Sequence, residues 1–168
     1  MSMSQEMKYC MECGTKLEIR PLKDEGLVPY CPHCKMYRFP IFNVAVSMIV
    51  TNEKEDQILL IKQYGRNTYI LVAGYVNKGE DAEQAVVREV KEEMNLDVHH
   101  VRFNHSHYFA KSNTLMLNFT AIVDGHVRPN WEIDSYHWFS REEARKNIRP
   151  NSLAEAFLVG YLDGAYHF

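Results

Sequence analysis

Two pairs of cysteines near the N-terminus constrain this chain more than any other feature of its sequence. Cys10 and Cys13 form one C-x2-C pair, Cys31 and Cys34 form a second, and 17 residues lie between the pairs. Two intervening residues let a tight turn direct both sulfurs at one ion, and this separation is typical of a tetrahedral four-thiolate zinc site. Four thiolates leave no open coordination position, so the sequence predicts a structural zinc ion with His33 beside it as a non-ligand.

The cysteines lie in a segment whose composition differs from the rest of the chain. Residues 9–39 hold all four cysteines and three of the six prolines, with few aliphatic side chains. A module of about 30 residues buries too little apolar surface to fold alone, and zinc binding of roughly 10–16 kcal/mol supplies the missing stability. We therefore expect a zinc ribbon over residues 1–39 and a second domain over 40–168, with the polar residues 1–8 frayed.

Length and composition place the larger part among ordinary globular domains. The chain has 168 residues, 46% of them apolar, and a net charge of -3, which disfavours general attraction to nucleic acid or acidic lipid. No apolar run approaches the roughly 20 residues of a membrane span, and the start, MSMSQEMK, has no secretory apolar segment. We expect a cytoplasmic protein without a membrane partner, whose reduced thiols bind metal.

Strands and helices are predicted to alternate beyond residue 41. Runs rich in β-branched and aliphatic residues predict strands at 43–50, 57–63, 68–72, 98–109, 115–123 and 133–139. Helical spacing predicts a helix over 82–94, with Asp81 and Gln84 capping its start and Asn95 ending it in a left-handed conformation. The sum is an α/β (α+β) fold in which a mixed sheet lies between helices, an α/β/α sandwich.

Two Ser-x-x-Glu sequences, at Ser140 and Ser152, predict a pair of helices at the C-terminal end. The last of them carries one apolar stripe, formed by Leu153, Ala154, Phe157, Leu158, Tyr161 and Leu162. Such a stripe covers a sheet face or joins two subunits, so a homodimer is one alternative.

Three glutamates crowd one side of the predicted helix over 82–94. At about 100° per residue, Glu89, Glu92 and Glu93 fall within an arc of roughly 100° that borders the buried side. Like charges about 4 Å apart repel by roughly 4 kcal/mol at an effective dielectric of 20. Arg88 is expected to point to a different side. Clustered carboxylate oxygens are the ligands that Mg²⁺ or Mn²⁺ prefers, and a solvated acidic helix face is the alternative.

The spacing around these glutamates resembles the Nudix hydrolase family, whose motif is G-x5-E-x7-R-E-U-x-E-E-x-G-U with U a bulky aliphatic residue. The positions that match are Gly74, Glu80, Arg88, Glu89, Val90, Glu92, Glu93 and Leu96. Asn95 replaces the last glycine of the motif, a mild change because asparagine tolerates a left-handed backbone. The resemblance implies a Nudix-type sandwich that hydrolyses a diphosphate linking a nucleoside to a second group.

The resemblance also implies the catalytic metal ligands. Glu89, Glu92 and Glu93 would bind Mg²⁺ or Mn²⁺ with help from the Gly74 backbone carbonyl. These ions would neutralise the diphosphate, activate a water and stabilise the leaving oxygen.

Two further roles follow from the same resemblance. Glu80 would pair with Arg88 and hold the loop against the helix. The family adds one acidic residue from beyond the motif, for which Glu132 is the first choice and Asp134 the second. The alternative for Glu132 is a solvent-facing position at the start of a strand.

A zinc ribbon directly before a Nudix domain is similar to the NADH pyrophosphatase branch of that family. The branch carries S-Q-P-W-P-F-P-x-S after the motif. Residues 106–114 keep Ser106, have Phe109 for the tryptophan and Thr114 for the last serine, and lack all three prolines. NAD(H), ADP-ribose, FAD-like and dinucleoside substrates are therefore all open. Tyr108 or Phe109 would stack on a base, unless both belong to the sheet core.

A second function class is a Nudix-like sensor or binding module that uses the zinc ribbon to contact RNA or protein. The intact set of glutamates argues against it, because sensors commonly lose the catalytic carboxylates. The basic residues of the ribbon keep an RNA end open as a substrate: Lys8, Lys16, Arg20, Lys23, Lys35 and Arg38. Four histidines, at positions 99, 100, 105 and 107, form either a second metal site or, more commonly, an exposed strand surface.

Overall fold

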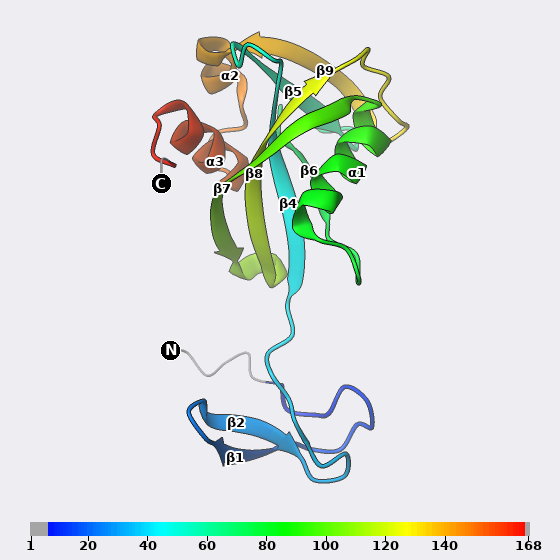
Figure 1. Ribbon diagram of the computed structural model, residues 1–168, viewed down its shortest axis with the longest axis vertical. Coiled ribbons are helices and arrows are strands. Elements are labelled where there is room, and N and C mark those ends of the chain that lie inside the picture. The colour runs from blue at the N-terminus through cyan, green and yellow to red at the C-terminus, as the bar shows by residue number, and fades with distance from the viewer. Residues whose placement is uncertain (1–6, 167–168) are drawn as a thin grey trace. The chain divides into compact units, whose positions relative to one another are not determined.

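The computed structural model describes residues 7–166, so most of the segment 1–8, predicted to be frayed, lies outside the described residues. Contacts divide the chain into two compact units, Met1–Phe42 and Asn43–Phe168. The smaller unit contains one antiparallel three-stranded sheet (Figure 1). Its strands are β1 (Glu18–Leu22), β2 (Gly26–Cys31) and β3 (Met36–Tyr37).

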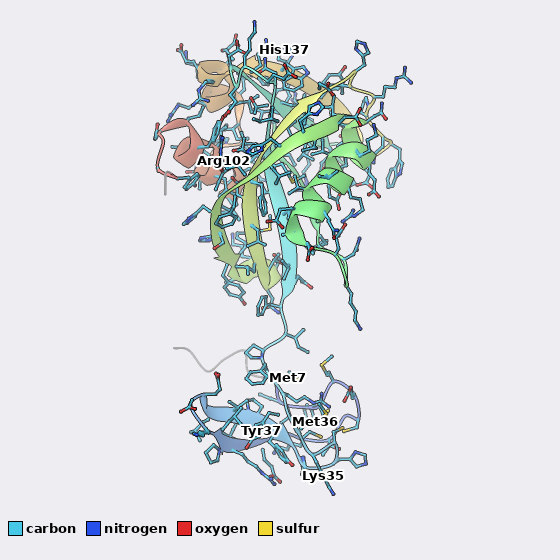
Figure 2. All side chains as sticks on the ribbon, viewed as in Figure 1. Met7, Lys35, Met36, Tyr37, Arg102 and His137 are labelled. Atoms are coloured by element: carbon cyan, nitrogen blue, oxygen red, sulfur yellow. The ribbon has the colours of Figure 1, made fainter. Side chains whose placement is uncertain are left out.

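The smaller unit has little apolar core of its own. Among its described residues, the buried hydrophobic side chains are Cys10, Val28 and Cys31, and two of these three are cysteines. Tyr30 and Tyr37 add one edge-to-face contact with ring centroids 5.0 Å apart. Figure 2 shows how the side chains of this unit surround the strands, with sulfur atoms gathered at one end. A module with so small a core needs another source of stability, and a bound metal ion is one such source.

The larger unit is built on a mixed six-stranded sheet. Its strands are β4 (Asn43–Thr51), β5 (Gln57–Gln63), β6 (Val72–Tyr75), β7 (Asp97–Phe109), β8 (Thr114–Asp124) and β9 (Ile133–Ser140). They run in the order β7-β8-β4-β5-β9, and β6 also pairs with β4. The β4–β8 pair is parallel and the others are antiparallel, so the predicted mixed sheet is confirmed.

Helices cover both faces of this sheet, as predicted for an α/β/α sandwich (Figure 1). Helix α1 (Ala82–Met94) packs on one face, and α2 (Arg141–Asn147) and α3 (Leu153–Leu162) pack on the other. A 3-10 turn, η1 (Ala110–Ser112), joins β7 to β8. Successive buried side chains alternate between the two faces: Met48 belongs to the core under α1, and Ile49 to the core under α3.

The helix ends follow the sequence signals. The backbone N–H of Asp81 donates to Oε1 of Gln84 at 3.0 Å, which closes the first turn of α1. Asn95 ends α1 with φ 57° and ψ 24°, the left-handed conformation predicted for it. Ser140 and Ser152 begin α2 and α3, and each side chain accepts a hydrogen bond from the backbone of the glutamate three residues later.

One predicted strand is displaced along the sequence. The sequence indicates a strand at 68–72, whereas the structure has β6 at Val72–Tyr75, with Gly74 opposite Val46 of β4. Tyr69 and Ile70 form only isolated bridges. Glycine weakens strand propensity, so the pattern appeared to end before Gly74. The glycine is needed at this position for a reason that only the tertiary structure shows.

The apolar stripe of the last helix is used inside the chain. Phe157 and Leu158 are fully buried in the core under α2 and α3, and the other four stripe residues pack against the same core. The stripe is therefore used to cover the sheet face. Within residues 7–166, the structure has no helix that is long and apolar enough to cross a membrane.

Candidate active site and metal centres

The four cysteines gather at one point of the smaller unit. The Sγ atoms of Cys10 and Cys34 lie 3.9 Å apart, those of Cys13 and Cys31 lie 3.5 Å apart, and all four fall within 4.8 Å of one another. Four sulfurs about 2.3 Å from a tetrahedral ion would be separated by about 3.8 Å. These separations are far longer than a disulfide bond, and all four thiols are free. The cluster therefore has the dimensions of a four-thiolate metal site.

Charged neighbours surround this cluster. Arg38 is almost completely buried and forms an ion pair with Glu12, and this pair raises the pKa of Arg38. Cys10 and Cys34 also interact with the Arg38 guanidinium, which partly offsets the negative charge of thiolates. Arg38 is therefore not an exposed RNA contact, contrary to its place among the basic residues of the ribbon. His33 lies beside the cluster, with Nδ1 4.0 Å from Sγ of Cys34.

The three glutamates of α1 differ in exposure although they share one side of the helix. The side chain of Glu92 is 58% exposed and that of Glu89 is 13% exposed. Glu93 is 5% exposed and belongs to the buried side of α1. The helix therefore directs two carboxylates inward, against the sheet, and one outward toward solvent.

Arg88 pairs with Glu80, as the family resemblance implies. Its Nε donates to Oε1 of Glu80 at 2.7 Å and its Nη2 donates to Oε2 at 2.9 Å, a bidentate ion pair that lowers the pKa of Glu80 to about 2. Arg88 also donates to Glu89 at 2.7 Å and to Glu92 at 3.2 Å. The expectation that Arg88 points away from the glutamates is therefore wrong, because its long side chain bends back along the helix.

Gly74 lies directly against Glu89. A Cβ atom added at position 74 would lie 2.0 Å from Cδ of Glu89, which is far inside van der Waals contact. Arg88 Nη2 meanwhile donates to the backbone oxygen of the next residue, Tyr75, at 2.9 Å. The missing side chain thus lets α1 approach β6 closely enough for the Glu89 carboxylate to meet the strand backbone.

Glu132, about 40 residues after α1 in the sequence, lies near the glutamates of α1. It precedes β9 and is half-buried, and its negative charge acts on Glu89 and Glu93. The Tyr64 hydroxyl donates to Oε2 of Glu132 at 2.6 Å. Asp134 instead accepts from the backbone N–H of Gly65 at 2.6 Å, and it is exposed. Of the two acidic candidates, only Glu132 acts on the glutamates of α1.

The connection before β9 is fastened to the C-terminal end of α1. The backbone N–H of Arg128 donates to the carbonyl of Met94, and that of Asn130 donates to the carbonyl of Glu93, each at 2.9 Å. Helix carbonyls at this end otherwise lack partners. The Asn130 side chain also accepts from the backbone N–H of Glu132 at 2.9 Å. These contacts bring residue 132 to the helix. The spacing of residues in the sequence does not predict them.

Crowding of these carboxylates changes their acidity. Burial is the main cause that raises the pKa of Glu93, to about 8, and the charges of Glu89, Glu132 and Glu92 add to it. Burial likewise raises the pKa of Glu89. Oε2 of Glu93 is buried without a hydrogen-bond partner among the described residues. An unpaired oxygen among like charges is suited to a divalent cation, and an all-oxygen donor set favours Mg²⁺ or Mn²⁺.

The three candidate substrate residues lie on the same sheet but at a distance. Pairing places Ser106 of β7 in one row with Leu117, Val46 and Gly74, so three strand spacings, about 14 Å, separate Ser106 from Gly74. Tyr108 follows on the same face of β7, is exposed, and donates to Oδ1 of Asn113 at 2.6 Å. Phe109, one residue further, is half-buried on the other face. These residues do not contact the carboxylates.

One of the four histidines belongs to a group that could hold a metal. His99 lies with Glu53 and Asp124, and its Nε2 is 2.9 Å from Oδ2 of Asp124, a contact that raises the pKa of His99. All three residues are exposed. An ordinary surface ion pair accounts for this arrangement, in keeping with the commoner interpretation of exposed strand histidines.

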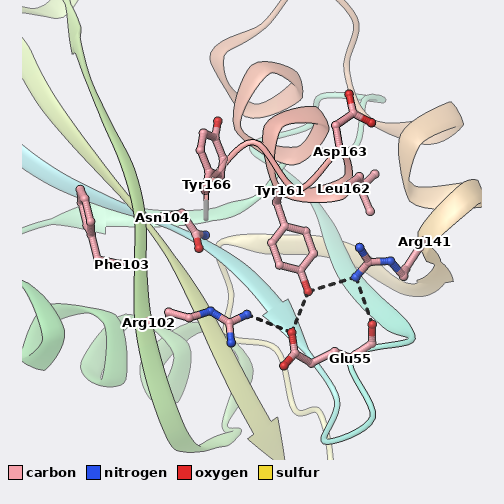
Figure 3. A pocket seen from close by; sticks show the side chains of 10 residues that line it. Glu55, Arg102, Phe103, Asn104, Arg141, Tyr161, Leu162, Asp163 and Tyr166 are labelled. Carbon is pink, nitrogen blue, oxygen red and sulfur yellow. Dashed lines mark hydrogen bonds and ion pairs between the residues drawn. The ribbon is translucent and has the colours of Figure 1, made fainter. Parts of the chain in front are cut away.

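A separate hollow of about 730 Å³ lies between β7 and the end of α3 (Figure 3). Glu55 accepts from Arg102 at 3.0 Å and from the Tyr161 hydroxyl at 3.0 Å, while Arg141 donates to the Glu55 backbone oxygen at 3.3 Å. Arg141 also donates to the Tyr161 hydroxyl at 3.2 Å. Arg102 thus connects the β4–β5 turn to β7, and Arg141 connects it to α2. The glutamates of α1 are not part of this hollow.

Comparison with known proteins connects these sites to one family. A family model described as NUDIX domain matches residues 41–157. A Pseudomonas aeruginosa protein named NAD-capped RNA hydrolase NudC is 32% identical over 159 residues, which is 92% of this chain and 55% of the relative. A Vibrio cholerae protein of the same name is 30% identical over 160 residues, 93% of this chain and 58% of the relative. The chain thus spans little more than half the length of these relatives.

Solved structures show the same fold. A NUDIX hydrolase from Nitrosomonas europaea aligns with a TM-score of 0.68 at 24% identity, covering 96% of this chain and 93% of that one. A MutT structure from work on Aliivibrio salmonicida and Vibrio cholerae aligns with a TM-score of 0.61 at 19% identity, covering 72% and 99% of the two chains.

Proposed function

This chain belongs to the NUDIX family, and from that premise we propose that it is a divalent-cation-dependent hydrolase of nucleoside diphosphates linked to a second group. The observation that carries the proposal is the set of glutamates on α1, joined by Glu132, with one buried carboxylate oxygen of Glu93 left without a partner. Repulsion between these carboxylates destabilises the metal-free protein, and a bound cation would relieve it.

Each residue of the site has a proposed part. The buried Glu89 and Glu93 would hold Mg²⁺ or Mn²⁺, and the exposed Glu92 would add a carboxylate on the solvent side of the set. The Gly74 backbone carbonyl adds one oxygen ligand. When bound, the cations would neutralise the diphosphate and lower the pKa of an attacking water. Arg88 balances part of the acidic charge and, through Glu80, fixes the loop that precedes the helix.

The proposed substrate class is an NAD-like dinucleotide, free or at the end of an RNA. Two observations support this class. The relatives that align over 92% and 93% of the chain are named as NAD-capped RNA hydrolases. The sheet also carries the exposed Tyr108 on the same face of β7 as Ser106, which lies about 14 Å from Gly74 across the sheet, so an aromatic side chain is available to a second ring of an extended substrate.

The N-terminal residues 1–39 are proposed to be a separate zinc-ribbon domain, with 40–168 as the hydrolase domain. Supporting this, the four sulfurs have the spacing of a tetrahedral thiolate site and Arg38 lies beside them. Zinc here is structural, because four thiolates leave no position for a substrate.

A substrate panel tests the proposal. The purified protein is incubated with NAD(H), ADP-ribose, FAD, dinucleoside diphosphates and NAD-capped RNA, each with Mg²⁺ or Mn²⁺, and mononucleotide products are quantified. We expect NAD to yield NMN and AMP, and NADH to yield reduced NMN (NMNH) and AMP. Absence of cleavage for every substrate would overturn the proposal, and RNA binding with a steep salt dependence in that case would favour the sensor alternative.

Two variants locate the chemistry. Glu92→Gln or Glu93→Gln is expected to lower kcat at least ~100-fold, the scale of losing one electrostatic stabiliser. Glu142→Gln is the matched control, because Glu142 is an exposed glutamate of α2 that forms an ion pair with Lys146. Near-wild-type turnover of both site variants at saturating Mg²⁺ would contradict the assignment.

A further inference from the structure

The turn that follows β5 holds an aromatic residue in a conformation that such residues avoid. Tyr64 has φ 54°, and the next residue, Gly65, has φ 69°. Glycine adopts positive φ freely, but a bulky side chain there is crowded by its own backbone. Tyr64 is 60% exposed, so burial in the core does not compensate for the crowding. Strain of this kind persists when specific contacts at a functional site maintain it.

Two contacts, both to the segment that carries Glu132, maintain this turn. The Tyr64 hydroxyl donates to Oε2 of Glu132 at 2.6 Å, and the Gly65 backbone N–H donates to Oδ2 of Asp134 at 2.6 Å. Both acceptors lie almost 70 residues later in the sequence. A hydrogen bond to a carboxylate is among the stronger kinds in proteins. The left-handed turn thus directs the phenol at one acidic side chain.

Glu132 is held from the opposite side as well. Its backbone N–H is bound by Asn130, and Asn130 is bound by the Glu93 carbonyl at the end of α1. The backbone of Glu132 therefore has a fixed place beside the helix, whereas its carboxylate has only the Tyr64 hydroxyl as a recorded hydrogen-bond partner among the described residues. Without that bond, repulsion from Glu89 and Glu93 would turn the Glu132 carboxylate toward solvent.

We propose that Tyr64 is a positioning residue, which holds the Glu132 carboxylate toward Glu89 and Glu93 and so assembles the cation-binding set before a cation arrives. This inference rests on the proposed function, since it assigns Glu132 to the same site. In this inference Tyr64 is not itself a ligand of the cation, because its hydroxyl donates to Glu132. It acts as the outer hydrogen-bond partner of a ligand, and loss of such partners typically costs about 10–100-fold in metal affinity or activity.

The test compares Tyr64→Phe with Tyr136→Phe. Tyr136 is a matched control, because it is another partly exposed tyrosine, on β9, whose hydroxyl has no recorded hydrogen bond within the described residues. Mn²⁺ binding to the substrate-free protein is measured by electron paramagnetic resonance at fixed pH. We expect Tyr64→Phe to weaken Mn²⁺ binding about 10-fold, and to lower kcat by a similar factor with KM for the nucleotide within about twofold. Tyr136→Phe is expected to match the wild type.

A double variant separates positioning from general stabilisation. If Tyr64 acts through Glu132, adding Tyr64→Phe to Glu132→Gln lowers Mn²⁺ affinity no further than Glu132→Gln alone. An equal further loss in the double variant, or unchanged Mn²⁺ affinity in Tyr64→Phe, would overturn the inference. A wild-type protein that binds Mn²⁺ but cleaves no substrate would overturn the proposed function instead, and the Mn²⁺ comparison would still decide the part played by Tyr64.

Discussion

Among single residues, Glu93 has the carboxyl group whose surroundings most favour a bound cation. The side chain is 5% exposed, one oxygen lacks a partner among the described residues, and its pKa is raised to about 8. Burial of a charge without compensation is costly, so the metal-free protein favours the protonated acid. A bound cation would reverse that preference.

The raised pKa of Glu93 predicts a pH dependence of stability. In the unfolded chain this carboxyl titrates near 4.5, and in the folded protein near 8, so folding takes up a proton between these values. The free energy of unfolding without added Mg²⁺ should therefore fall as pH rises from about 5 to 8, by about 2–4 kcal/mol. Chemical denaturation at several pH values measures this free energy of unfolding, with zinc present at the same concentration throughout.

Glu93→Gln supplies the control for that experiment. The amide has nearly the same shape and does not titrate, so the variant should lose most of the decline between pH 5 and 8. Saturating Mg²⁺ should have the same effect on the wild type, because the cation stabilises the charged form. An identical decline in both proteins would mean that other groups cause it, His99 among them, whose raised pKa acts in the same direction.

Among the secondary-structure elements, the approach of α1 to β6 decides whether the glutamates form one site. Gly74→Ala would place a Cβ 2.0 Å from Cδ of Glu89 and so push that carboxylate away. We expect kcat to fall at least ~10-fold, since misplacing a catalytic group by about 1 Å can cost about 100-fold. Steady-state kinetics together with a thermal melt measure the effect.

Gly160→Ala is a suitable comparison for Gly74→Ala. Its added Cβ would lie 2.2 Å from the Tyr166 hydroxyl, an equally close approach on α3. It should alter the C-terminal packing and leave turnover near that of the wild type. Equal loss of turnover in both variants would indicate that general loosening, not displacement of Glu89, explains the effect.

The end of α1 offers a second test at the scale of elements. Asn95 occupies a left-handed conformation and is exposed, and its backbone N–H donates to the Lys91 carbonyl at 3.0 Å. Asn95→Ala should lower the free energy of unfolding by about 1–2 kcal/mol, because a Cβ is crowded in that conformation. Asn95→Gly should retain the wild-type value to within about 0.5 kcal/mol or exceed it. Urea denaturation distinguishes them, and equal stability of both variants would contradict the cap.

For the whole molecule, the division into two units predicts that the units respond separately when the proposed zinc ion is lost. Cys31 is fully buried among the thiols, so Cys31→Ser should abolish zinc retention and unfold the smaller unit. The larger unit has its own two cores and should stay folded. Zinc analysis and the dispersion of backbone amide resonances report on the two units. Loss of dispersion for residues of both units would contradict separate domains.

Several features of the molecule could be predicted because they depend on residues close together in the sequence. Periodicity placed α1 at 82–94, Asn95 marked its end, and two cysteine pairs marked the four-cysteine cluster. Each of these signals operates within a few residues, where propensity and spacing dominate. The strand predicted at 68–72 was displaced because its true position depends on a distant residue. Glycine is unfavourable in a strand, and the need for Gly74 is visible only from the Glu89 side chain packed against it.

The parts of the site that were missed involve distant segments. The bend of Arg88 toward Glu89 and Glu92, the burial of Arg38 beside the thiols and the bond from Tyr64 to Glu132 have no local signal. Sequence periodicity describes which side of a helix a residue occupies, but not how far a long side chain bends along it.

Residue types and their spacing were enough to determine the family, the α/β/α class, the four thiols as one cluster and the glutamates as a group. Only the tertiary structure decided which glutamate is buried, which acidic residue joins from outside the helix, and what holds that residue in place. The physical reason is that burial and electrostatic repulsion depend on every neighbour in space. Such neighbours come together only when β5, β9 and α1 have packed.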